Sequence, residues 1–411
     1  MAWKLYLGIA LILFAAILLT WRGSSGLRTS LEGFAATPAD VSEIAKKVIA
    51  QSTVLDNYKV KTLVPMSTVL KGVPASQQYL VNVAPITITY TGYLGAGVFD
   101  ATEFFKHALG LGIRSFVLPI STYKDDNKTA PLWPASGSPA VVYRDSNGNI
   151  DCKNGLSVKQ IASALVNALS VSSPQQEEPI LLKLEQVIDP KTGYFIPNPN
   201  TMEKEYVEVM TRIAEELEPL RSRILAHLGS YGSALGGIAE DKILLQTPLS
   251  DLAGKVLITT DFDVGKYEKD MYAKLKPSLL TRIHFRVRNT PAQGKISSYK
   301  TTPLSSVDAN FPTDQARTTL YEARDATITD VDNVTTARSR GIQIIPLPLF
   351  DAGKAADALT LIQPWKGAAW TIKPQGERYT KPTPVVSATP SQKMNARVAA
   401  DAQPGQVVIG N

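Results

Sequence analysis

The sequence alternates between short apolar runs rich in β-branched residues and segments with helical spacing, and this alternation restricts the fold most. Six apolar runs predict strands, at 81–90, 113–120, 139–143, 179–185, 254–260 and 341–349. Helical patterns between them lie at 101–112, 156–169 and 202–228. Strands regularly separated by helices favour a parallel sheet with both faces covered. For a chain of 411 residues, this order predicts a closed α/β barrel of the TIM type.

Two other segments affect this prediction. In 202–228, apolar residues recur every three or four positions and form one face, but Pro219 should kink this helix or split it. The stretch 291–336 is polar and weakly periodic, which predicts a long inserted loop. A short amphipathic helix is predicted to begin at Pro38, before the first strand.

The N-terminus carries an uncharged apolar run at 5–20. Trp3 and Trp21 bracket it, and Lys4 and Arg22 lie beside them, which is typical of a helix that spans a bilayer. A cleaved signal peptide is the alternative, but no clear small-x-small cleavage site follows the run. We therefore expect a single-pass N-terminal anchor and a membrane location. The flanking charges nearly balance, so they favour neither orientation.

The expected organisation has four parts. They are a transmembrane anchor at 1–22, a linker with a short helix at 23–75, a barrel at 76–375 with a polar insertion near 291–336, and a Pro-rich flexible tail at 376–411.

Composition excludes several classes of site. Cys152 is the only cysteine, so neither a disulfide framework nor a cysteine metal cluster can form within the chain. There are only three histidines, far apart in sequence, which leaves little material for histidine-based acid–base or zinc chemistry. The formal charge of +6 is not gathered into a basic stripe, so no nucleic-acid partner is expected.

Six segments, in the same order, resemble the X and Y halves of the phosphoinositide-specific phospholipase C barrel. They are TYTGYL (89–94), GIRSFVLP (112–119), PAVVYRDS (139–146), PILLKLE (179–185), TPLSDLAGKVLITTD (247–261), and RGIQIIPLPLFDAG (340–353) with GAAWTIKP (367–374). Each match is weak by itself. Six matches in the same order, from about residue 80 to 375, are much harder to obtain by chance. The resemblance implies an α/β barrel of the phospholipase C-like phosphodiesterase type.

The resemblance also implies where catalytic groups should lie. In that family one histidine serves as general acid and base, a second stabilises the charge on phosphorus, and eukaryotic members hold a calcium ion. Seven of these positions carry other residues here: Tyr90 and Ser146 for the two histidines, Thr91 for the metal-ligand asparagine, Val117 and Pro119 for the paired acidic ligands, and Thr259 and Asp261 for the phosphate-binding lysines. Only Glu185, a metal-ligand position, is retained.

One carboxylate cannot hold a catalytic calcium ion, and valine or proline side chains cannot replace oxygen ligands. We therefore expect a catalytically degenerate barrel with no catalytic residues, metal or cofactor. The leading hypothesis is a membrane-anchored structural or interaction protein that contacts other proteins through its loops and tail. A minor capsid or membrane protein in the virion of a large DNA virus is one setting that fits. The alternatives are a module that binds inositol phosphates or lipid headgroups, and an active phosphodiesterase with a rearranged site.

Overall fold

Parallel strands follow one another in chain order in the computed structural model. It describes residues 46, 63–90, 99–123, 137–143, 150, 152, 154–171, 178–188, 194–224, 243–262, 285–286, 299–303, 307, 311, 316–324, 330–350 and 360–382. The chain divides into two units, Met1–Tyr379 and Thr380–Asn411. Every element named below belongs to the first unit.

Eight strands make up the parallel set. They are β1 (Val83–Thr89), β2 (Ile113–Tyr123), β5 (Ile180–Gln186), β7 (Val256–Thr260), β8 (Phe285–Arg286), β9 (Tyr299–Pro303), β10 (Leu320–Arg324) and β11 (Pro346–Leu347). Parallel pairing joins β11, β1, β2, β5, β7 and β8 in that order, and it also joins β9 to β10. A parallel bridge from Glu322 to Ile344 connects β10 to the residues just before β11. The only neighbours in chain order without pairing among the described residues are β8 and β9, so the strands form an α/β barrel-like fold with one seam.

Four short strands extend this framework by antiparallel pairing. They are β3 (Pro139–Val141), β4 (Leu156–Ser157), β6 (Tyr194–Phe195) and β12 (Trp370–Ile372). The first pairs with β2 and with β4, while β6 pairs with the end of β2. The last strand, β12, pairs with the beginning of β1 and so brings the C-terminal part of this unit back to the first barrel strand.

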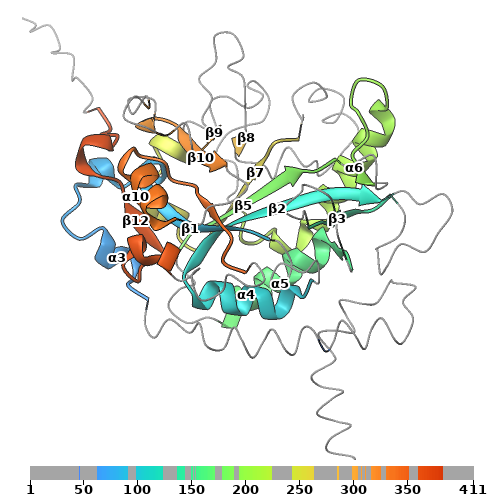
Figure 1. Cartoon of the computed structure of the whole chain (residues 1–411), viewed down its shortest axis with the longest axis horizontal. Coiled ribbons are helices and arrows are strands. Elements are labelled where there is room, and N and C mark those ends of the chain that lie inside the picture. The colour runs from blue at the N-terminus through green and yellow to red at the C-terminus, as the bar shows by residue number, and fades with distance from the viewer. Residues whose placement is uncertain are drawn as a thin grey trace, which may run out of the picture. The chain divides into compact units, whose positions relative to one another are not determined.

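Helices pack against the strands. They are α3 (Met66–Val69), α4 (Ala101–Gly110), α5 (Val158–Val171), α6 (Glu203–Glu216) and α10 (Val331–Ser339). Of these, α4, α5 and α6 cover the outer face of the strands. In Figure 1, α4 and α5 lie side by side along the strands β1 and β2. Asp100 caps α4, because its side chain accepts a hydrogen bond from the backbone N–H of Glu103 at 3.0 Å. The helix predicted around Pro219 does end there: α6 stops at Glu216, and the proline lies in a 3₁₀ turn.

Alternation along the strands separates two cores. On β5, Ile180, Leu182 and Leu184 belong to the core between the sheet and the helices. Leu181, between them, belongs to a second core that also includes Leu257. Because side chains alternate between the faces of a strand, this second core fills the inside of the barrel at the N-terminal ends of its strands.

The polar stretch at 291–336 differs from its prediction as an inserted loop. It contributes β9 and β10 to the barrel, and α10 begins within it. These strands are five residues long and direct polar groups such as Glu322 inward, so no apolar alternation marks them in the sequence. The run at 341–349 is likewise less regular than predicted, because prolines at 346 and 348 provide no N–H groups for pairing and only Pro346–Leu347 form a strand.

The predicted anchor at 1–22, the predicted helix that begins at Pro38 and most of the predicted tail lie outside the described residues. In the part of the chain that is described, no helix has both the length and the apolar character needed to cross a bilayer.

Candidate functional site

The C-terminal ends of the barrel strands surround a small cavity of about 100 Å³. Its lining comes from the ends of β1, β2 and β5 and from the residues after β3: Thr89, Tyr90, Pro119, Val142, Tyr143, Glu185 and Val187. Parallel strands end at one edge of the barrel, which is where α/β barrels carry their functional sites. We call this cavity the mouth cavity. Figure 1 shows β1, β2 and β5 running next to one another.

Among the described residues that line the mouth cavity, Glu185 provides the single carboxylate. It lies at the end of β5, is half-buried, and pairs in register with Pro119 of β2. The two positions expected to hold acidic ligands are Pro119 and Val117, and both belong to β2, next to β5. Neither side chain carries an oxygen atom, so the calcium ion implied by the resemblance does not fit these residues. Within the described ranges, no cluster of three His, Cys, Asp or Glu side chains could hold a metal ion.

Tyr90 reaches the mouth cavity, but its ring packs on the outside of the sheet. The ring centroid lies 4.1 Å from that of Phe104 and 5.3 Å from that of Phe99, in the core beneath α4. The residue before it, Thr89, pairs in register with Val117. By the alternation of strand side chains, Thr89 therefore occupies the inward position at this level, and the phenol of Tyr90 belongs to the aromatic core.

The two positions expected for phosphate-binding lysines do not line the mouth cavity. Thr259 is fully buried on β7 and pairs in register with Lys183 of β5. Asp261 follows β7, and its Oδ1 accepts a hydrogen bond from the backbone N–H of Gln186 at 2.7 Å. That carboxylate holds the ends of two neighbouring strands together. The remaining two predicted positions, Thr91 and Ser146, lie outside the described residues.

The structure adds a buried charged group that the sequence reasoning missed. Lys183 Nζ lies 2.7 and 2.6 Å from the two carboxylate oxygens of Glu322, and the hydroxyl of Tyr299 donates to the same carboxylate at 3.0 Å. The side chains of Lys183 and Glu322 are only 3% and 2% exposed. We call these three residues the barrel triad. One signal was present in the sequence. In PILLKLE, Lys183 and Glu185 are two residues apart and therefore share one face of the strand, opposite to the face of Leu182 and Leu184.

The barrel triad determines the electrostatics below the mouth cavity. Lys183 lies two residues before Glu185 on the same face of β5, which would place a cation close beneath the mouth. Its ammonium group is bound by both oxygens of Glu322, so the pair is neutral as a unit. A second anion would have to compete with a buried carboxylate for the same ammonium group. The mouth therefore offers a bound anion no unpaired cation from β5.

Taken together, fold and cavity define a parallel α/β barrel with a small, mostly uncharged mouth. No protein-family model matches the sequence, and no curated protein matches it. Solved structures to which the chain is similar include L. pealei PLC21, with 15% identity over 77% of this chain and 40% of that one, at a TM-score of 0.47. A calcium-dependent phosphoinositol-specific phospholipase C from Pseudomonas sp. has 14% identity over 73% of this chain and 97% of that one, at a TM-score of 0.42. A calcium-dependent phosphatidylinositol-specific phospholipase C from Streptomyces antibioticus has 13% identity over 69% and 98%, at a TM-score of 0.43.

Proposed function

We propose that this chain is a catalytically inactive barrel of the phospholipase C type that serves as a membrane-anchored structural or interaction protein. One observation carries the proposal: among the described residues that line the mouth cavity Glu185 is the single carboxylate, and the inward cation two residues before it, Lys183, is held by Glu322. Phosphodiester cleavage needs a group that accepts a proton from the nucleophile and a positive charge that stabilises the phosphorus-centred transition state. Among the described residues that line the mouth cavity, the carboxylate of Glu185 could accept the proton, but none provides the positive charge.

The proposed role of the barrel is to present surfaces. A fold persists as a scaffold when its site chemistry is lost, because activity belongs to the site and not to the fold. The apolar run at 5–20 would tether the barrel to a membrane, and the Pro-rich segment after about 376 would contact neighbouring proteins by ordering on binding. The virion of a large DNA virus with a membrane is one assembly in which such a protein would serve.

The test of inactivity uses the full chain in detergent micelles with phosphatidylinositol, glycerophosphodiesters and sphingomyelin as substrates, with and without calcium. We expect no turnover above that of the Glu185→Gln variant, which removes the only carboxylate among the described residues that line the mouth cavity but keeps the size of the side chain. Turnover by the wild-type chain that Glu185→Gln abolishes would refute the proposal and establish a rearranged phosphodiesterase site.

The same preparation tests the headgroup-binding alternative. Isothermal titration with inositol phosphates should give no heat of binding, because the ammonium group of Lys183 already has two carboxylate contacts. If the wild-type chain binds inositol phosphates and the Glu322→Gln variant binds them more tightly, the ammonium group of Lys183 is available to anions. That result would replace the scaffold proposal with a binding function. The tether is tested separately by alkaline extraction of membranes: the full chain should stay in the pellet, and a chain lacking residues 1–22 should not.

A further inference from the structure

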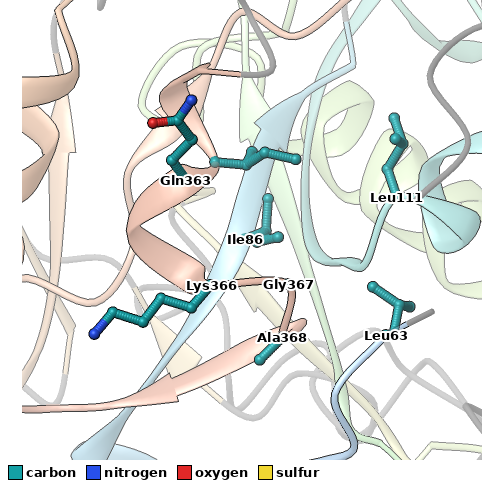
Figure 2. A pocket seen from close by; sticks show the side chains of 8 residues that line it. Leu63, Ile86, Leu111, Gln363, Lys366, Gly367 and Ala368 are labelled. Atoms are coloured by element: carbon teal, nitrogen blue, oxygen red, sulfur yellow. The ribbon is translucent and has the colours of Figure 1, made fainter. Parts of the chain in front are cut away.

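A second cavity, larger than the mouth, lies on the outside of the barrel. Its volume is about 330 Å³, within the range of roughly 300–1,000 Å³ that is usual for small-molecule sites. Figure 2 shows it over β1, between the turn that follows α4 and the 3₁₀ turn Gln363–Trp365. The residues that line it are Leu63, Ile86, Leu111, Ile362, Gln363, Lys366, Gly367 and Ala368. We call it the outer cavity.

Fixed backbone contacts build the walls of the outer cavity. The N–H of Val64 donates to the carbonyl of Gly367 at 2.9 Å, and Val64 forms a parallel bridge with Ala368. On the other side Gly112 has a φ of +86°, and a Cβ at that position would lie 2.9 Å from Leu63 Cδ2. Leu63 is thus packed directly on a glycine backbone. The cavity belongs to the paired framework of β1 and β12.

The chemistry of the lining is that of a hydrocarbon site with one charge at its edge. Figure 2 shows Leu63, Ile86 and Leu111 around one open space, while the side chain of Lys366 leaves from the rim with its amine turned away. Ile86 and Leu111 are buried, whereas Gln363 and Lys366 are exposed. The aliphatic side chains offer water no hydrogen-bond partners, so a hydrocarbon that covers them removes apolar surface from water. The lining has one charged side chain, that of Lys366.

Lys366 also has an unusual backbone conformation. Its φ of 53° and ψ of 38° are left-handed, and it is the only described non-glycine residue with a positive φ. Glycine adopts this conformation without cost, whereas a residue with a Cβ is strained in it. A lysine at this position therefore costs stability. Its four-carbon stem is flexible enough to turn the ammonium group over the opening of the cavity.

We propose that the outer cavity binds the single alkyl chain of a fatty acid, whose carboxylate pairs with Lys366 at the rim. The volume suits one chain, the aliphatic lining complements it, and the one charge has the sign that a carboxylate requires. This site is separate from the mouth cavity, with which it shares no lining residue. It requires neither activity nor inactivity of the mouth, so the result of the turnover assay does not decide it; only the bilayer control below rests on the proposed anchor.

The experiment uses the full chain in lipid nanodiscs and a fatty acid that carries a photoreactive diazirine near the end of its chain. Labelled peptides are mapped by mass spectrometry, and saturated fatty acids of increasing length serve as competitors. We expect labelling of the peptides that contain Leu111 and Ile362. Competition should strengthen about fourfold (~0.8 kcal/mol) for each added methylene until the cavity is full. Labelling of the N-terminal peptide at 1–22 provides an internal control for non-specific insertion into the bilayer.

Two variants make the test specific. Ala368→Phe fills the cavity and should abolish labelling of the Leu111 and Ile362 peptides, while labelling at 1–22 stays unchanged. Lys366→Gly relieves the backbone strain but removes the charge, so it should weaken competition by fatty acids roughly two- to fivefold. The same variant should leave competition by the corresponding uncharged alcohols unchanged.

The proposal would be overturned if the Leu111 and Ile362 peptides were labelled in Ala368→Phe as strongly as in the wild-type chain. It would also be overturned if neither peptide were labelled in the wild-type chain. Equal loss of acid and alcohol competition in Lys366→Gly would overturn the assignment of the carboxylate to this lysine. Stronger competition by two-chain phospholipids than by fatty acids would overturn the assignment to a single chain. Circular dichroism of each variant verifies that the barrel is folded.

Discussion

Replacing Glu322 with glutamine should destabilise the barrel far more than removal of an ion pair usually does. In the folded chain, the ammonium group of Lys183 lies within 2.7 Å of both Glu322 oxygens, and both side chains are almost completely shielded from water. Glu322→Gln keeps the shape of the side chain but leaves the ammonium group buried beside a neutral amide. Removing one partner of such a pair costs about 3–5 kcal/mol, most of which is the desolvation of the remaining charge.

The measurement is urea unfolding of the full chain in non-ionic detergent, followed by far-ultraviolet circular dichroism. Glu218→Gln is the matched control, because Glu218 lies 3.2 Å from Arg221 in an exposed pair whose side chains are 48% and 80% accessible. That substitution should cost less than about 1 kcal/mol. The two variants remove the same charge by the same chemical change, so the difference between them measures the effect of burial.

A double variant separates the cost of an unpaired charge from the value of the pair. Lys183→Met with Glu322→Leu removes both charges and leaves the buried hydroxyl of Tyr299 without this acceptor, which costs about 1–3 kcal/mol. The double variant should therefore be much more stable than Glu322→Gln. If Glu322→Gln costs no more than Glu218→Gln, or if the double variant is as unstable as the single one, the reasoning about a buried, mutually neutralised pair is wrong.

Three further predictions follow from single residues. Lys366→Gly should raise the free energy of unfolding by about 1 kcal/mol by relieving the positive φ, and the same urea titration checks this; no change or a loss would contradict it. Burial lowers the pKa of Lys373 from 10.5 to about 7, so the unfolded chain binds more protons between these pH values and the free energy of unfolding should rise with pH across them. Lys373→Met should remove this part of the slope in unfolding curves recorded across that range, and an unchanged slope would exclude Lys373 as its source. Asp100→Ala should cost about 1 kcal/mol by removing the cap that binds the N–H of Glu103, whereas Asp100→Asn should cost less; equal losses would argue against a capping role.

The local pattern of the sequence was sufficient to predict most elements up to β7. β1, β2, β3, β5 and β7 and the helices α4, α5 and α6 all fall within or next to the predicted ranges. These elements carry their signal in neighbouring residues, as alternation of two or spacing of three to four. Strands such as β10 carry no such signal, because their inward positions hold polar groups whose partners come from distant parts of the chain.

The candidate site shows the same division. The residue types at the predicted positions are a property of the sequence: the side chains of Val117 and Pro119 cannot ligate a metal in any fold, and the chain has only three histidines. The direction of the Tyr90 ring is not such a property, because it depends on which face of β1 the helix α4 covers.

What the sequence determined by itself is therefore an α/β barrel-like fold and the residue types that stand at the quoted motifs. The tertiary structure alone decided how charges and cavities are arranged. Lys183 and Glu322 are 139 residues apart and meet only because β5 and β10 face one barrel interior. The outer cavity exists only because residues 63 and 368, which are far apart in sequence, lie next to each other beside β1. Contacts between distant residues depend on the packing of whole elements, which no local spacing along the chain encodes.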